Sequence, residues 1–450
     1  MKKIKLLGFA VCALTLAGAV GCGSQSEVPD VPGGNTGDDT QTGFTESYGE
    51  VSTPINIWAS DQECDVIRDV VDTYNKQQTS DANKFKVTLK EVSEADAGTT
   101  LSNDPTVTGA PALFLCADDH INNLVSKNIV VEIKGTYKER IDESIADISI
   151  SAATLGGKLY GFPVTSDNGY FLWYDNSYFD AEDVKSLETI LDVCKEEGKT
   201  FGFDVENGYY ANSFIMSPQA AGLDSLKWGR DSNGAIVYDI DWDSAEAVKV
   251  SEYAESLLKP LQSAGTIVGD TAGGNALFAS GFKDGKMIAC ISGTWMESDL
   301  TEAIGADKLS ATKLPEYHVD GKAYQMASFS GTKVYCLNKT RPAAEQKVAA
   351  ALADLLTTKE AQLRRYEIRQ SVPCNEEAVK DARYAEHLTK SAVAIQEQSK
   401  FSATQSQAAE NRYWDAGKAI GGSYLKGLPT DYPTWSEFLK YYCDMLRKAQ

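Results

Sequence analysis

The sequence contains few residues in patterns that are typical of catalytic sites. The sequence has no G-x-S-x-G or H-E-x-x-H pattern, and its three histidines, His120, His318 and His387, are scattered. The common serine-hydrolase and zinc-hydrolase arrangements are therefore excluded. What remains for binding chemistry is a set of aspartates and aromatic residues. Asp119 follows an apolar run, at the type of loop that carries binding groups, and a solvated acidic turn is the alternative.

Cysteine chemistry is equally limited. The chain has no C-x-x-C pair, which argues against zinc ribbons and thioredoxin-like chemistry. Apart from Cys12 and Cys22, most cysteines lie in apolar runs, and we interpret them as small core hydrophobes. They are Cys64, Cys116, Cys194, Cys290, Cys336, Cys374 and Cys443. This odd number leaves at least one thiol unpaired, and the sequence fixes no disulfide connectivity.

Cys22 stands in the setting of an export signal. Lys2, Lys3 and Lys5 precede an apolar run over residues 6–19 that is too short to span a bilayer, and small residues follow it. A cysteine directly after them resembles the lipobox of bacterial lipoproteins. That resemblance implies cleavage after residue 21 and a lipidated Cys22, held on the membrane by two acyl chains. The alternative is an ordinary signal peptide with an incidental cysteine.

Residues 22–51 have the composition of a flexible linker. Gly, Ser, Thr, Gln, Pro and Asp dominate the stretch, so it cannot bury enough apolar surface to offset the entropy of ordering the chain. Thirty-odd such residues reach about 30 Å. We therefore expect the folded part of the protein to move near the membrane without leaving it.

Length and charge set further limits. The roughly 400 residues after the linker are too many for a single hydrophobic core, so we expect two domains. With 43 basic and 64 acidic residues the formal net charge is −21, which argues against nucleic acid and anionic lipid headgroups as partners. After the signal, the sequence contains no apolar run long enough to cross a membrane.

Strand-like runs alternate with helical patterns along the chain. We expect strands at 55–59, 85–89, 112–116, 170–174 and 287–291, and helices around 66–74, 187–194 and 348–356. This alternation predicts an α/β architecture with largely parallel sheets.

Four segments then carry a family resemblance. They read APALFLCADDH (110–120), LGGKLYGFPV (155–164), FKDGKM continuing to SGTW (282–295), and ASFSG (327–331) followed by TTKEAQ (357–362). In this order they resemble the extracellular solute-binding proteins of ABC sugar importers, the branch that includes the maltose-binding proteins. The resemblance covers the chain after about residue 52. It implies an α/β, two-lobed periplasmic-binding-protein-like fold with a hinge and a ligand cleft between the lobes.

The same resemblance predicts how the lobes divide the chain. The N-terminal lobe is expected to comprise residues 52–165 and 310–372, and the C-terminal lobe residues 166–309 and 373–450. Each lobe would therefore be discontinuous in sequence.

The resemblance also assigns ligand-binding residues. A sugar has apolar C–H faces and a rim of hydroxyls, so its site needs aromatic platforms and strong acceptors. Asp119, Asp167, Trp295 and Trp414 match positions that line the family's cleft. The alternatives are a turn-forming role for Asp167 and core packing for Trp295.

Further candidates are less sharply defined. Either of the adjacent Tyr209 and Tyr210 could face the ligand, and Trp58 could line the cleft or belong to the core. Asp61 and Gln62 lie in the first loop, and His120 follows Asp119. Three departures from the maltose-binding pattern bear on which sugar is bound. Cys116 replaces a tryptophan, His120 an arginine and Gln62 a basic residue.

The sequence thus predicts a monomeric cell-surface lipoprotein, anchored on the extracytoplasmic face of the membrane, that captures an oligosaccharide for an ABC permease. A maltooligosaccharide is the first choice of ligand. We expect no catalysis, no cofactor and no metal. Two alternatives stay open, namely an exported glycoside hydrolase acting through Asp119 and Asp167 and a solute receptor that serves a membrane sensor.

Overall fold

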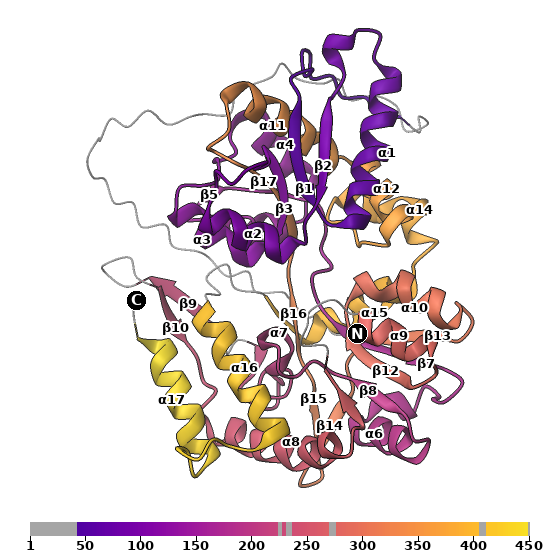
Figure 1. The fold of residues 1–450 in the computed structure, drawn as a ribbon, viewed down its shortest axis with the longest axis vertical. Helices are drawn as coiled ribbons and strands as arrows, with labels where there is room; N and C mark the ends of the chain where they lie inside the picture. Colours follow the sequence, from indigo (N-terminus) through magenta and orange to yellow (C-terminus); the bar gives the residue numbers. More distant parts are fainter. Residues whose placement is uncertain (1–42, 224–226, 231–235, 270–275, 405–410, 449–450) are drawn as a thin grey trace, which may run out of the picture.

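A computed structural model describes residues 43–223, 227–230, 236–269, 276–404 and 411–448. Figure 1 shows an upper and a lower lobe joined by crossing segments. The predicted signal peptide, the predicted lipidation site Cys22 and the expected linker up to residue 42 lie outside the described residues. Within the described part, no helix combines the length and apolar character needed to cross a membrane.

The first lobe is built on a five-stranded sheet in the order β2-β1-β3-β17-β6. Its strands are β1 (Ile55–Ala59), β2 (Val87–Glu91), β3 (Leu113–Ala117), β6 (Phe162–Pro163) and β17 (Lys333–Leu337). The sequence LFLCA makes β3 apolar throughout, as expected of a central strand covered on both faces, and residues 113–116 are fully buried. Its helices include α1 (Asp61–Gln77), α2 (Glu94–Asn103), α11 (Ala343–Thr357) and α12 (Lys359–Arg369).

The second lobe has its own five-stranded sheet in the order β11-β8-β12-β7-β13. The strands are β7 (Phe171–Asp175), β8 (Thr200–Gly202), β11 (Ile267–Val268), β12 (Met287–Ser292) and β13 (Leu309–Thr312). The helices α6 (Leu187–Glu196), α8 (Ala245–Ser263), α9 (Ala276–Lys283), α10 (Glu297–Ile304), α16 (Asn411–Lys426) and α17 (Trp435–Arg447) also belong to this lobe (Figure 1). The strands and helices expected from the sequence are all present, with ends shifted by a few residues.

The expectation of largely parallel sheets is wrong. In the first sheet β1 runs parallel to β2 and β3, whereas β17 is antiparallel to both of its neighbours. In the second sheet β8 is parallel to β11 and β12, whereas β7 is antiparallel to both of its neighbours. Both reversed strands follow directly on a segment that crosses between the lobes, so they need not continue the βαβ path of their sheet.

The expected lobe boundaries also need correction. Residues 309–312 form β13, which pairs with β7, so this segment belongs to the second lobe and not to the first. Its return to the first lobe comes between β16 (Ser328–Ser330) and β17. At the other boundary, α13 (Glu376–Lys380) and α14 (Ala382–Ala385) pack beside α12, and α15 (Lys390–Gln398) packs on β13. Tyr384 holds α14 in place through an edge-on contact with Tyr366.

Residues 43–51, the end of the expected linker, are packed on the first lobe. Phe44, Tyr48 and Val51 are 7%, 1% and 0% exposed and belong to its core. The Tyr48 hydroxyl donates to Asp354 at 2.7 Å, and the Val51 N–H donates to the Ala82 carbonyl at 2.9 Å. Residues 43–51 therefore do not belong to the expected linker, because these apolar side chains bury enough surface to order the segment.

The seven cysteines after Cys22 are all buried thiols, which confirms their interpretation as core residues. Cys116 and Cys336 lie on the neighbouring strands β3 and β17 with their sulfur atoms 3.9 Å apart.

Candidate functional site

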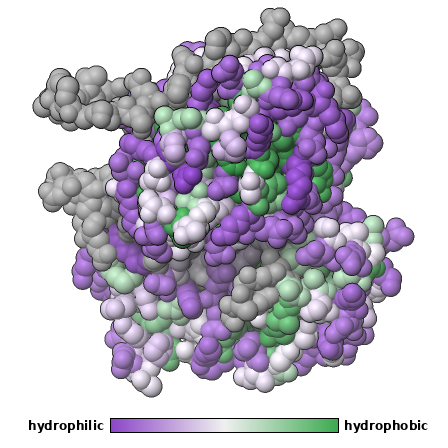
Figure 2. Space-filling model, turned by 45° about the horizontal axis from the view of Figure 1, so that its top comes forward, coloured by the Kyte–Doolittle hydropathy of each residue, from purple (hydrophilic) through white to green (hydrophobic). Residues whose placement is uncertain are grey.

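The predicted site lies where the two lobes meet. Figure 2 shows the surface recessed between the lobes, with hydrophilic residues along the adjoining rim of the upper lobe. Side chains from both lobes approach one another here. They come from the turn after β3, the start of β17, the turn after β12, the short helix α7 (Gly208–Ala211) and the first turn of α16.

Two adjacent carboxyls follow β3 in a short 3₁₀ turn at Asp118–His120. Asp118 is fully buried, and neither of its side-chain oxygens accepts a hydrogen bond of normal geometry from a described residue. Burial raises its pKa well above the usual range, and the charge of Asp119 raises it further. Asp119 is half-buried, and one of its oxygens likewise has no such partner within the described chain. The sequence singled out Asp119 and missed Asp118.

The structure separates the two adjacent tyrosines. Tyr209 is half-buried, donates its hydroxyl to the Asn168 carbonyl at 3.1 Å and stacks on Phe329 with ring centroids 5.7 Å apart. Burial raises the pKa of Tyr209, and the charges of Asp118 and Asp119 contribute, which places its hydroxyl near the first-lobe carboxyls. Tyr210 is 8% exposed and packs in the second-lobe core. Tyr209 is thus the tyrosine that faces the other lobe.

Trp414 joins Tyr209 and Phe329 in an aromatic cluster. Its ring centroid lies 6.3 Å from that of Tyr209 and 5.7 Å from that of Phe329. The indole is half-buried, whereas its neighbour Tyr413 is fully buried. α16 therefore places Trp414 beside Tyr209.

Trp295 approaches the first lobe from the turn after β12. Its half-buried ring lies over Gly293, where a Cβ atom would come within 2.2 Å of the indole, so only glycine leaves room for this ring position. The Lys333 ammonium, from the first residue of β17, lies 5.8 Å from the ring centroid. Lys333 is only 4% exposed, and its nearest acidic partner is Glu94 at 3.9 Å. Neither Lys333 nor Glu94 was predicted from the sequence.

Glu94 belongs to a network of buried ion pairs. Arg369 contacts Glu94 at 3.4 Å and Glu63 at 2.7 Å, and Arg365 also binds Glu63. Burial alone would raise the pKa of Glu63, but the two guanidinium groups outweigh it and lower the pKa to about 2. Because Glu63 lies on α1 and both arginines lie on α12, the network holds these two helices of the first lobe together.

Asp167 lies on the crossing segment and joins three parts of the chain. It is fully buried and accepts hydrogen bonds from the Val372 N–H at 2.9 Å and the Thr294 hydroxyl at 3.2 Å. Val372 follows α12 by three residues, and Thr294 directly precedes Trp295. One oxygen of Asp167 is thus committed to holding these segments together. The other has no partner of normal geometry in the described chain.

The remaining sequence candidates are spread around the first lobe. Trp58 is 2% exposed in the first-lobe core with Lys90 over its ring, so of the two roles considered for it the structure shows core packing. Asp61 is exposed and Gln62 half-buried, both in the first turn of α1. The His120 ring lies against Gly98 of α2.

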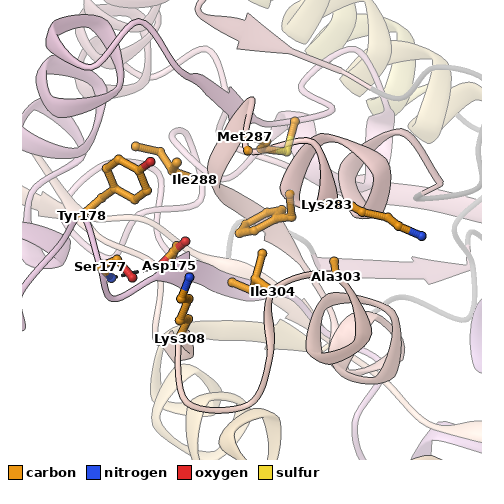
Figure 3. A pocket seen from close by; sticks show the side chains of 11 residues that line it. Asp175, Ser177, Tyr178, Lys283, Met287, Ile288, Ala303, Ile304 and Lys308 are labelled. Atoms are coloured by element: carbon orange, nitrogen blue, oxygen red, sulfur yellow. Dashed lines mark hydrogen bonds between the residues drawn. The ribbon is translucent and has the colours of Figure 1, made fainter.

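A cavity of about 560 Å³ lies elsewhere, at one end of the second sheet. Figure 3 shows Tyr178, Asp175 and Lys308 on one side of it and Ile304 and Ala303 on another. It includes none of the residues predicted from the sequence, so it is separate from the interlobe site.

Comparisons with known proteins agree with this architecture. The family model described as "Bacterial extracellular solute-binding protein" matches residues 69–392. A maltooligosaccharide ABC transporter solute-binding lipoprotein of Streptococcus pneumoniae is 24% identical over 391 residues, which cover 84% of this chain and 82% of that protein.

Solved structures with the same fold include a maltodextrin-binding protein from L. casei BL23. Its TM-score is 0.68 at 20% identity, over 89% of this chain and 100% of that one. A Thermus thermophilus maltotriose-binding protein, solved with maltotriose, also has a TM-score of 0.68, at 16% identity over 87% of this chain and 99% of that one. At these identities the likeness establishes the two-lobed fold.

Proposed function

Because the chain belongs to the family of bacterial extracellular solute-binding proteins, we propose that it captures an oligosaccharide between its lobes and delivers it to an ABC permease. A maltooligosaccharide is the proposed ligand, as the names of the similar lipoprotein and of the solved structures suggest.

The proposal rests mainly on one observation: charged side chains of the first lobe lie close to aromatic rings of the second lobe. The first lobe contributes Asp118, Asp119 and Lys333, and the second contributes the rings of Tyr209 and Trp295. Hydroxyls of a sugar can bond to the carboxyls and the ammonium, while its C–H face lies on an aromatic ring. Neither lobe alone offers both kinds of group in this set.

Capture is proposed to work by hinge closure. A ligand that contacts both lobes stabilises the closed arrangement over the open one, so the population shifts toward closure when sugar is present. Asp167 suits a hinge because it lies on a crossing segment and bonds to Val372, just after α12, and to the turn that carries Trp295. Movement at the hinge is thus proposed to be coupled to the position of that ring.

The proposal includes a lipid anchor at Cys22 on the extracytoplasmic face of the membrane, with a monomeric receptor behind it. Since residues 43–51 are packed on the first lobe, the free tether is shorter than the sequence implied. About 20 residues span roughly 25 Å as a flexible coil. Such a tether keeps the receptor at a high effective concentration near its permease.

One observation favours a second function, that of a glycoside hydrolase. The pKa of Asp118 is raised and a second carboxyl, Asp119, lies beside it, as in an acid and carboxylate pair that cleaves glycosidic bonds. The rival pair of Asp119 and Asp167 is less suited, because one Asp167 oxygen is committed to Val372 and Thr294.

The decisive experiment follows both binding and the fate of the sugar. The chain lacking residues 1–22 is titrated calorimetrically with maltooligosaccharides of three to seven units, and the mixtures are then analysed by chromatography. Saturable heat with intact sugar is expected. Progressive cleavage, or no heat with any sugar of the series, would overturn the proposal.

A further inference from the structure

Asp118 is a buried acid with no side-chain hydrogen-bond partner in the described fold, although the backbone N–H groups of Asp118, Asp119 and Thr332 lie close enough to lower its pKa in part. Both of its oxygens are inaccessible and receive no hydrogen bond of normal geometry from a described residue. Burying an ionised carboxylate without such partners is strongly unfavourable, so the neutral form is favoured. A residue that served only to stabilise the fold would be expected to have partners. A binding residue can instead acquire them from its ligand.

We propose that Asp118 binds the ligand directly beside Asp119, and that the two carboxyls act as one hydrogen-bond donor and one acceptor toward neighbouring hydroxyls of a single sugar ring. This rests on the proposed function and deepens it. Vicinal hydroxyls each donate and accept, so a neutral acid next to a carboxylate matches them in a way that two carboxylates cannot.

The groups around Asp118 favour its neutral form. Asp119, on the same turn, brings a negative charge. The Cys116 thiol of β3 and the Tyr209 hydroxyl of α7 interact with Asp118 as neutral groups, because the contact with Cys336 together with burial raises the pKa of Cys116, and burial raises the pKa of Tyr209. Beneath them, Cys336 of β17 contacts Cys116. The nearby cations are engaged elsewhere, Lys333 with Glu94 and Arg369 with Glu63 and Glu94.

The position of Asp118 also explains how a ligand could reach it. Tyr209 comes from the second lobe and interacts with both carboxyls. Opening of the hinge would carry this ring away from the turn after β3, and closing over a sugar would enclose the pair again. Asp118 thus acts as a specificity-determining group that is accessible only in the open arrangement.

A pH dependence follows. If the neutral acid is the binding form, affinity is highest below the pKa of Asp118 and falls as the pH rises through it, because a proton must then be taken up on binding. An asparagine at this position would keep a neutral donor and remove the titration. An alanine would remove both.

The test titrates the chain lacking residues 1–22 with maltotriose at pH 5, 6, 7 and 8, comparing wild type with D118N, D118A and D119N. We expect the affinity of D118N to lie within threefold of the wild-type affinity at the pH of tightest binding and not to change with pH. The affinities of D118A and D119N should each be lower by tenfold or more. Thermal unfolding of each variant checks that it folds.

Three outcomes would overturn the inference. They are a folded D118A that binds like wild type, a D118N that keeps the wild-type pH profile, or a D118N weaker by tenfold, which would mean that the ionised carboxylate is required. A wild-type chain that binds no sugar would instead refute the proposed function, so the two failures are distinguishable.

Discussion

The ammonium of Lys333 lies 5.8 Å from the ring centroid of Trp295, and the two residues come from opposite lobes. Lys333 starts a strand of the first-lobe sheet, whereas Trp295 follows a strand of the second. A partly desolvated cation over an indole is worth about 0.5–2 kcal/mol. The contact therefore contributes directly to holding the lobes together.

Replacing Lys333 by methionine should weaken maltooligosaccharide binding by about two- to thirtyfold, since about 0.5–2 kcal/mol of cross-lobe attraction is lost. Calorimetry measures the affinity. Lys90→Met is the matched control, because Lys90 also lies over a tryptophan, Trp58, but within the first lobe. Equal losses in both variants would show that the Lys333 contact has no special part in closure.

Trp295→Ala and Trp414→Ala should each weaken sugar binding by about tenfold or more. Stacking on an aromatic ring is worth on the order of 1–3 kcal/mol by analogy with nucleobases. The control is Tyr441→Ala, an aromatic residue of α17 that is 49% exposed. If both tryptophan variants bind as tightly as wild type, the assignment of the aromatic platforms is refuted.

The two adjacent tyrosines should respond differently to substitution. Tyr209→Ala is expected to weaken binding with a modest loss of stability, because its half-buried ring faces the first lobe. Tyr210→Ala should mainly lower the free energy of unfolding, by about 3–5 kcal/mol, as for other buried aromatic residues. Denaturant unfolding and calorimetry together separate the two effects. The reverse pattern would mean that Tyr210 is the ligand-facing residue.

Glu63 should make the fold sensitive to acid. Its pKa is lowered from 4.5 to about 2 in the folded protein, so its stabilising effect is complete above pH 4.5 and is lost as the pH falls toward 2. Glu63→Gln should be less stable than wild type at pH 7, and the difference should shrink in acid. Thermal unfolding at pH 7, 4 and 3 measures it. A difference that stays constant with pH would contradict the ion-network account.

Continuous apolar runs made the central strands predictable. β3 and β12 are buried along their length and stand out in the sequence, whereas β13, with the sequence LSAT, carries no such signal. The lobe boundary at residue 310 was misplaced for that reason. Phe44, Tyr48 and Val51 were likewise overlooked, since they are isolated apolar residues in a polar stretch, and their burial depends on a partner surface far away in sequence.

The candidate site was predictable only where a motif marked it. Asp119 and Trp295 lie in segments that resemble the family, and Trp414 matches a family cleft position on a late helix. The structure places all three near the interlobe junction. Asp118 looks like a solvated neighbour of Asp119 in the sequence. Lys333 resembles an ordinary polar residue at the start of a strand. Their burial arises from tertiary packing, which local sequence patterns do not encode.

The most direct test of the account is a crystal structure of the chain lacking residues 1–22 grown with maltotriose. The account predicts a sugar enclosed between the lobes, with one ring against Trp295 and hydroxyls within hydrogen-bonding distance of Asp118 or Asp119. A sugar bound outside this junction, for example in the second-lobe cavity beside Tyr178, would contradict it.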